Sequence, residues 1–215
     1  MATKDRKTMF SEMAEKLSKQ YPAQASPEPA VSGRIVQMVA GQMAKRGYEM
    51  STKAIEIVTD YLKGYNLWLC GNVGVGKTYF FDIMSRVRQE EKSLPPIAKL
   101  SMIETTGWTM DLAREWVEDH RDDDVLLDDV GSEPVMNSYG VKAELFPYLL
   151  ENRMKNARKR THITSNLGPK DILARYDVRV SDRFVQMFKF EKFDAKKSRR
   201  ETRPWKTPRP GGGLL

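Results

Sequence analysis

The sequence predicts a three-layer α/β/α fold built around a mainly parallel sheet of five strands. Short apolar runs alternate along the chain with segments whose apolar residues recur at helical spacing, which is the pattern of a parallel sheet covered by helices on both faces. In addition, one of the apolar runs leads directly into a glycine-rich loop, and that loop opens a helical segment. Another apolar run ends in two acidic residues.

Each predicted element follows from its local pattern. The apolar runs predict strands at residues 65–70, 97–102, 125–130 and 161–166, with a fifth at 184–190. Helical spacing predicts helices over residues 35–47, 52–62, 79–88, 108–117 and 145–157, and one more near Leu173. In the helix at 52–62 we expect Ile55, Val58 and Leu62 to face the core. This order of elements, with no internal repeat, predicts a single α/β domain over residues 31–200.

The two ends of the chain differ from this core. Residues 1–30 are polar apart from Phe10, Met13 and Leu17, which share one face of a short helix before prolines interrupt it. This arm is either a mobile extension or a partner-docking helix on a tether. Residues 201–215 are rich in proline and glycine, which predicts a disordered tail with little to pack.

Composition limits the class of protein. The chain has 215 residues, a formal net charge of +7 and one cysteine, so an intramolecular disulfide is excluded and a reducing compartment is favoured. The first ten residues lack the apolar core of a signal peptide, and no stretch approaches the roughly 20 apolar residues of a membrane span. These observations predict a cytoplasmic protein without a membrane partner. The basic surplus favours an acidic partner, of which nucleic acid is the commonest.

The glycine-rich loop matches the pattern G-x-x-x-x-G-K-[ST] in full. Glycines allow backbone N–H groups to surround phosphates, and the following helix adds positive potential at its N-terminus. Lys77 is expected to contact the β- and γ-phosphates of ATP, and Thr78 to bind Mg²⁺. The residues predicted to hold the nucleotide are Gly71, Asn72, Val73, Gly74, Val75, Gly76, Lys77, Thr78 and Tyr79.

Polar residues end two further strands. Asp128 follows the apolar residues 125–127, so we expect it to hold Mg²⁺ through a bound water, and Asp129 to orient the attacking water. Many P-loop ATPases carry glutamate at the second position, so the shorter Asp129 indicates either a shifted water or slow hydrolysis. Asn166 ends the strand at 161–166 and is predicted to sense the γ-phosphate. The alternative for Asn166 is a turn or cap residue before residues 167–169.

Four segments occur in an order that resembles a known family. They are residues 67–70 (LWLC) before the glycine loop, 126–133 (LLDDVGSE), 161–167 (THITSNL) and 179–184 (RVSDRF). Over roughly residues 50–200 the chain resembles the DnaC-type bacterial replicative helicase loaders and the related IstB-type transposition helper ATPases. The resemblance implies an AAA+ fold, homo-oligomers joined through the ATP site, and an arginine finger at Arg183, with Arg179 as the substitute candidate.

An arginine finger has a physical reason, because phosphoryl transfer spreads charge that a neighbouring subunit's arginine neutralises. The alternative for Arg183 is a surface ion pair. Residues 198–200 (SRR) echo the short Ser-x-Arg segment that ends the family pattern. The chain departs from the family in Asp129, in its proline-rich tail, and in an N-terminal arm without the zinc cluster that some loaders carry.

Two basic clusters invite different interpretations. Residues 153–160 end a helix, where cations also suit the helix dipole, so a solvated face is favoured. Residues 189–209 interleave Phe190, Phe193 and Trp205 with lysines and arginines. Such mixing suits single-stranded DNA, because aromatic rings stack on bases while cations follow the phosphates.

Taken together, the sequence predicts an ATPase that binds a replicative DNA helicase and delivers it onto single-stranded DNA. One alternative is a transposition helper ATPase with the same site. Another is a nucleotide-binding switch with little hydrolysis, because of Asp129. A P-loop kinase is least favoured, since nothing resembles an acceptor site.

Overall fold

The computed structural model describes residues 33–45, 51–90, 96–138, 141–156, 159–176 and 178–193. The predicted docking helix at Phe10, Met13 and Leu17 and the predicted tail at 201–215 lie outside these residues. The central sheet has five strands in the order β2-β3-β6-β1-β7, and every neighbouring pair is parallel. The strands are β1 (Leu67–Cys70), β2 (Ile97–Ser101), β3 (Asp124–Val130), β6 (Thr161–Ser165) and β7 (Lys189–Lys192). The predicted α/β class with a parallel five-stranded sheet is confirmed.

The fifth strand begins later than predicted. Residues 184–187 belong to helix α8 (Val178–Met187), and β7 follows after Phe188. Val180, Phe184 and Phe188 are all buried, and their spacing of four residues is helical rather than alternating. A short apolar run is ambiguous between helix and strand, so the prediction was wrong here. A hairpin of β4 (Val135–Ser138) and β5 (Val141–Glu144) was not predicted.

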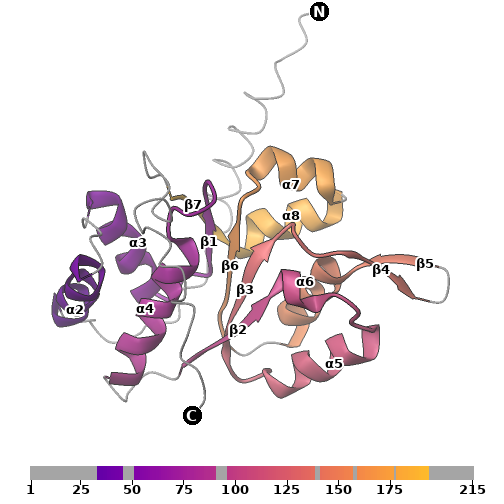
Figure 1. The fold of residues 1–215 in the computed structure, drawn as a ribbon, viewed down its shortest axis with the longest axis horizontal. Helices are drawn as coiled ribbons and strands as arrows, with labels where there is room; N and C mark the ends of the chain where they lie inside the picture. The colour runs from indigo at the N-terminus through magenta and orange to yellow at the C-terminus, as the bar shows by residue number, and fades with distance from the viewer. Residues whose placement is uncertain are drawn as a thin grey trace, which may run out of the picture.

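Helices α2 (Gly33–Ala44), α3 (Thr52–Leu62) and α4 (Lys77–Glu90) cover one face of the sheet (Figure 1). They pack against alternate strand residues, including Leu67 and Leu69 of β1. The expected inward residue Ile55 is 41% exposed, and Ile57 is buried in its place. The helical buried residues of this layer are Ile35, Val39, Met43, Ile57, Val58, Tyr61, Leu62, Phe80, Phe81, Ile83, Met84 and Val87.

Helices α5 (Met110–Asp119), α6 (Leu145–Asn156), α7 (Pro169–Arg175) and α8 cover the opposite face (Figure 1). The other alternate residues of the strands have their side chains on this opposite face. Trp68 of β1 packs edge-on against Phe184, with the ring centroids 4.7 Å apart. A short 3-10 helix, η1 (Met102–Thr105), connects β2 to α5. None of the described helices is both long and apolar enough to cross a membrane.

Part of the first basic cluster is buried, which corrects the solvated-face interpretation. Arg153 is 1% exposed and donates to the Thr161 hydroxyl at 2.9 Å and to three backbone carbonyl oxygens. Beside it, Asp124 accepts from Arg88 (2.6 Å) and Arg160 (2.7 Å). Burial alone would raise the pKa of Asp124, but the two guanidinium charges outweigh it and lower the pKa to about 2. These groups join β3, β6, α4 and α6 at the end of the sheet where β3 and β6 begin.

Candidate nucleotide-binding site

The glycine-rich loop stands between β1 and α4, which is the context that its motif requires. Gly74 and Gly76 have φ values of 82° and 102°, a backbone region that favours glycine. Gly71 is needed for a different reason, because a Cβ at this position would lie 2.2 Å from the carbonyl oxygen of Phe193. The loop therefore keeps its shape through two positive-φ turns and one close backbone contact.

Lys77 begins α4 at the end of the glycine loop and is only 5% exposed. Its Nζ donates to the carbonyl oxygens of Gly71 (2.7 Å) and Asn72 (3.1 Å). It also donates to Oδ1 of Asn166 at 2.8 Å, although 89 residues separate the two in sequence. The structure thus brings the predicted phosphate-binding lysine and the predicted γ-phosphate sensor into direct contact.

Thr78 and Asp128, the two predicted Mg²⁺ ligands, also meet. The Thr78 hydroxyl donates to Oδ1 of Asp128 at 2.9 Å, and the Thr164 hydroxyl donates to the same oxygen at 2.6 Å. Hydroxyl and carboxylate oxygens are the ligands that Mg²⁺ binds in phosphate sites, so Thr78 and Asp128 fit the ion. Lys99 of β2 lies on the same side, with its Nζ 3.5 Å from Oδ2 of Asp128 and 3.7 Å from Asp82 of α4.

Asp129 has an unusual backbone. Its φ is 58°, and it is the one non-glycine residue with a positive φ among those that the structure describes. The β3–β6 register shifts between Leu127 and Val130, so Asp129 lies in a bulge. Its N–H donates to the Thr164 hydroxyl at 2.9 Å, and its carbonyl oxygen accepts from the Ser132 N–H at 3.1 Å. Such bulges redirect side chains next to functional sites, and asparagine or aspartate tolerates the left-handed conformation best.

The loop after β3 is held by a cluster that sequence reasoning missed. Glu133 is 4% exposed and accepts from the N–H of Gly131 at 2.7 Å and from the Tyr176 hydroxyl. Arg175 donates to the Glu133 carbonyl oxygen at 2.9 Å, and burial together with Glu133 raises the pKa of Tyr176. No spacing in the sequence links residues 43 positions apart. The partnership of Lys99 with Asp128 was likewise invisible in the sequence.

The predicted arginine finger lies elsewhere in this single chain. Arg183 of α8 pairs with Glu151 of α6 at 3.4 Å, and its side chain is 34% exposed. This is the surface ion pair that the sequence left open as the alternative. The pKa of Glu151 is lowered by its hydrogen bonds to Lys155 and Arg183. Arg179 also belongs to α8, but its side chain lies outside the described part of the structure.

The structure describes the second basic cluster only as far as Phe193, and two of these residues already have contacts within the fold. Phe193 is 8% exposed and packs near Phe80, so it cannot stack on a base. Lys189 pairs with Asp60 at 2.6 Å. Phe190 is 40% exposed and is the described aromatic of this segment that remains accessible. Residues 194–209 lie outside the described residues.

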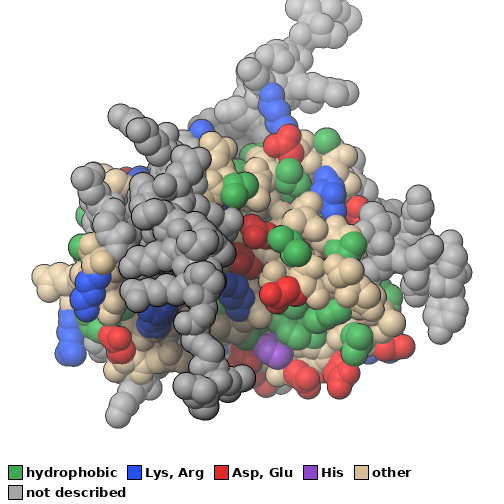
Figure 2. Space-filling model, in the orientation of Figure 1, with side chains coloured by type: hydrophobic (Ala, Val, Ile, Leu, Met, Phe, Trp, Pro, Cys, Tyr) green, Lys and Arg blue, Asp and Glu red, His purple; other side chains and the backbone are tan. Residues whose placement is uncertain are grey.

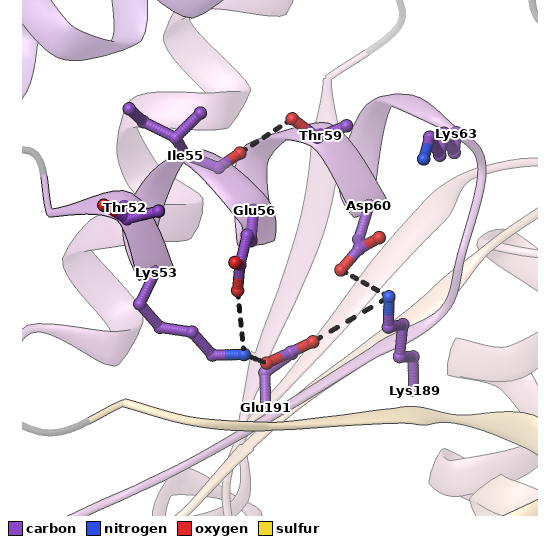
Figure 3. A pocket seen from close by; sticks show the side chains of 9 residues that line it. All are labelled: Thr52, Lys53, Ile55, Glu56, Thr59, Asp60, Lys63, Lys189 and Glu191. Carbon is purple, nitrogen blue, oxygen red and sulfur yellow. Dashed lines mark hydrogen bonds and ion pairs between the residues drawn. The ribbon is translucent and has the colours of Figure 1, made fainter.

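A separate hollow of about 360 Å³ lies between α3 and β7 (Figure 3). Its charged side chains pair with one another, because Lys53 contacts Glu191 and Glu56 while Lys189 bridges Asp60 and Glu191. Because both lysines are paired with carboxylates, little positive charge is left in this hollow to bind a phosphate group. The glycine loop with Lys77 is therefore the stronger candidate for a nucleotide site.

The parallel sheet, the glycine loop between β1 and α4, and the acidic end of β3 have the arrangement that the P-loop motif requires in an α/β fold. No protein-family model and no curated protein matches the sequence.

Similar solved structures include a crystal structure of DnaI, with 18% identity over 83% of this chain and 90% of that one, at a TM-score of 0.47. AMPPCP-bound DnaA from Aquifex aeolicus shares 18% identity over 71% of this chain and 50% of that one, at a TM-score of 0.48. A crystal structure of the DnaC helicase loader shares 18% identity over 84% of this chain and 99% of that one, at a TM-score of 0.43. These three TM-scores all lie below 0.5.

Proposed function

We propose that this chain binds ATP with Mg²⁺ at the glycine loop and hydrolyses it to ADP and phosphate. The observation that carries the proposal is that four predicted site residues meet. At the start of α4, Lys77 contacts Asn166 after β6, and Thr78 contacts Asp128 of β3. Lys77 binds the β- and γ-phosphates as a point charge, while loop N–H groups surround them. A bound Mg²⁺, held by Thr78 and Asp128, supplies charge neutralisation of the phosphate oxygens.

Asp129 and Asn166 are proposed to position the attacking water. Asp129 lies directly after the metal-binding aspartate, and its redirected backbone allows its carboxylate to differ in direction from a regular strand residue. Asn166 contacts Lys77 and so lies where the γ-phosphate is expected. Since Asp129 is one methylene shorter than glutamate, a switch with slow hydrolysis is the second candidate function.

We propose further that hydrolysis requires assembly. Arg183 lies on the outside of α8 and is partly exposed, so a neighbouring subunit could receive it in its own ATP site. Breaking its exposed pair with Glu151 costs little, because exposed ion pairs contribute about 0–1 kcal/mol. The homo-oligomer through the ATP site rests on this argument and on the sequence resemblance.

The biological role proposed is that of a helicase loader. The ordered sequence segments that resemble DnaC-type loaders support it, and residues 1–30 are proposed to dock the helicase through Phe10, Met13 and Leu17. Single-stranded DNA is assigned to the basic segment at 189–209, where Phe190 and Trp205 are the remaining stacking candidates. Counterion release drives such binding, so it should weaken steeply as salt rises.

The first test is titration of ATP with Mg²⁺ into Lys77→Ala. We expect binding to be lost, because Lys77 is the cation that the loop surrounds. The matched control is Lys63→Ala, which removes an exposed lysine and should bind ATP normally. Undiminished affinity in Lys77→Ala would remove the proposed ATP site.

The second test is co-purification of the full chain with candidate partners. We expect retention of a hexameric replicative helicase, and loss of that retention when residues 1–30 are deleted. Retention of a transposase instead would favour the transposition helper. Full helicase affinity without residues 1–30 would move the docking site onto the ATPase domain.

A further inference from the structure

An apolar surface is exposed along η1 and α5. Ile103 of η1 and Leu112 of α5 are 55% and 46% exposed. Trp108, Met110 and Trp116 pack against the core but are only partly buried. We call these five residues the α5 surface. Figure 2 shows hydrophobic side chains gathered over α5 with acidic side chains around them. A patch of large apolar groups with a charged rim is typical of an interaction site.

The rim of the α5 surface has a strong charge. Residues 103–123 contain seven acidic residues and two arginines, a net charge of −5, whereas the whole chain carries +7. Arg114 and Arg121 pair with Asp111 and Glu118 at 3.5 and 3.9 Å. The exposed acidic residues are Glu104, Asp111, Glu115, Glu118, Asp119 and Asp122. The surface therefore suits a basic peptide with apolar anchors and repels nucleic acid.

This chain contains such a peptide at its C-terminal end. Residues 194–215 hold seven lysines and arginines and two acidic residues, a net charge of +5. They also hold Trp205, Leu214 and Leu215 as apolar groups. The charge of the segment thus equals that of the α5 rim with the opposite sign.

The geometry of the sheet permits the two to meet within one chain. Phe193, the residue before the segment, donates to the Cys70 carbonyl oxygen at the carboxyl end of β1. η1 begins directly after β2, at the carboxyl end of that parallel strand. β7 and β2 are opposite edges of the five-stranded sheet, so four strand spacings, about 19 Å, separate their ends. About six extended residues span that distance, and the segment has 22.

We propose that residues 194–215 dock on the α5 surface of the same chain. Tethering favours this arrangement over docking between two copies, because a short linker gives an effective concentration near millimolar. The proposal goes beyond the ATPase and loader functions. Residues 194–209 cannot occupy the α5 surface and single-stranded DNA at the same time, so docking and DNA binding are alternative states of this segment.

Limited trypsin digestion of the full chain, followed by mass spectrometry, tests the docking. Cleavage should be slow at low salt and fast at high salt, because exposed ion pairs are screened. The cleavable sites are the basic residues of this segment that no proline follows, namely Lys196, Lys197, Arg199, Arg200 and Lys206. The double variant Glu115→Gln with Glu118→Gln should accelerate this cleavage by about three- to tenfold, the effect of losing a few exposed ion pairs. Leu112→Ser should accelerate it as well.

The matched control is Glu90→Gln with Asp182→Asn, which removes two exposed carboxylates on other helices and should digest like the wild type. Equal cleavage rates in the wild type and in both surface variants would overturn the proposal. Protection that disappears on dilution would also overturn it, because the occupant would then be a second copy.

Discussion

Replacing Gly71 by alanine tests the contact that closes the base of the glycine loop. The new Cβ would lie 2.2 Å from the carbonyl oxygen of Phe193 and 3.2 Å from its carbonyl carbon. Both are backbone atoms, and Phe193 is held by its 2.6 Å hydrogen bond to Cys70 and by burial against Phe80. The clash therefore cannot be relieved by turning a side chain. The end of β7 or the first residue of the loop must move.

We expect the variant to lose stability and ATP affinity together. Overpacking costs about 1–3 kcal/mol, and a backbone obstacle favours the upper part of this range. A loss of about 2–3 kcal/mol lowers the Tm of a chain of this size by roughly 4–12 °C. ATP affinity falls because the Gly71 carbonyl oxygen also accepts from Lys77 at 2.7 Å, so displacing Gly71 displaces the phosphate-binding lysine.

Denaturant and thermal unfolding with ATP titration measure both effects. Gly41→Ala is the control, because Gly41 lies inside α2 with nothing within 4 Å of an added Cβ. That variant should gain about 0.5–1 kcal/mol from helix propensity and bind ATP normally. If Gly71→Ala unfolds at the wild-type midpoint and binds ATP like the wild type, the contact between Phe193 and the loop does not constrain the site.

Further predictions concern catalysis, assembly, the metal ion and pH. Asp129→Asn should keep ATP affinity and the backbone φ of 58° but lower the rate of hydrolysis. Equal turnover in this variant and the wild type would exclude Asp129 from catalysis. Asp129→Glu must accept about 1 kcal/mol or more of strain from the left-handed backbone conformation. Arg183→Ala should bind ATP but lose assembly-stimulated hydrolysis, and mixing it with Lys77→Ala should restore some activity if the finger acts in trans. Lys99→Met should lower the Mg²⁺ concentration needed for ATP binding by about two- to fivefold, because it removes an exposed cation that competes for Asp128. Weaker ATP binding would instead indicate that Lys99 binds a phosphate. Burial lowers the pKa of His162 from 6.5 to about 3. The neutral imidazole therefore contributes stability to the folded state that is present above pH 6.5 and is lost as pH falls. At about 1.4 kcal/mol per unit, the unfolding free energy should drop by roughly 2 kcal/mol between pH 6.5 and about pH 4.5. His162→Asn should lack this drop in denaturant titrations.

The sequence by itself determined the glycine loop, the strands on either side of it and the acidic end of β3. These features are local: Gly74, Gly76 and Lys77 encode a turn and a helix start within eight residues, and residues 125–130 encode a buried strand. It also placed Asn166 at the end of β6, because parallel strands in such folds expose their carboxyl ends at one edge. Its error at residues 184–190 was local as well, since a short apolar run fits a helix or a strand equally.

Only the tertiary structure decided which distant groups meet. The contact of Lys77 with Asn166, the enclosure of Glu133 by Arg175 and Tyr176, and the burial of Arg153 each join residues from separate elements. Their energies depend on burial and on the partner's charge, and neither quantity is a property of sequence spacing. The same reason explains why Arg153 reads as a solvated helix end in the sequence but lies at 1% exposure in the fold. A local pattern specifies an element, whereas packing of the elements around the sheet specifies the site.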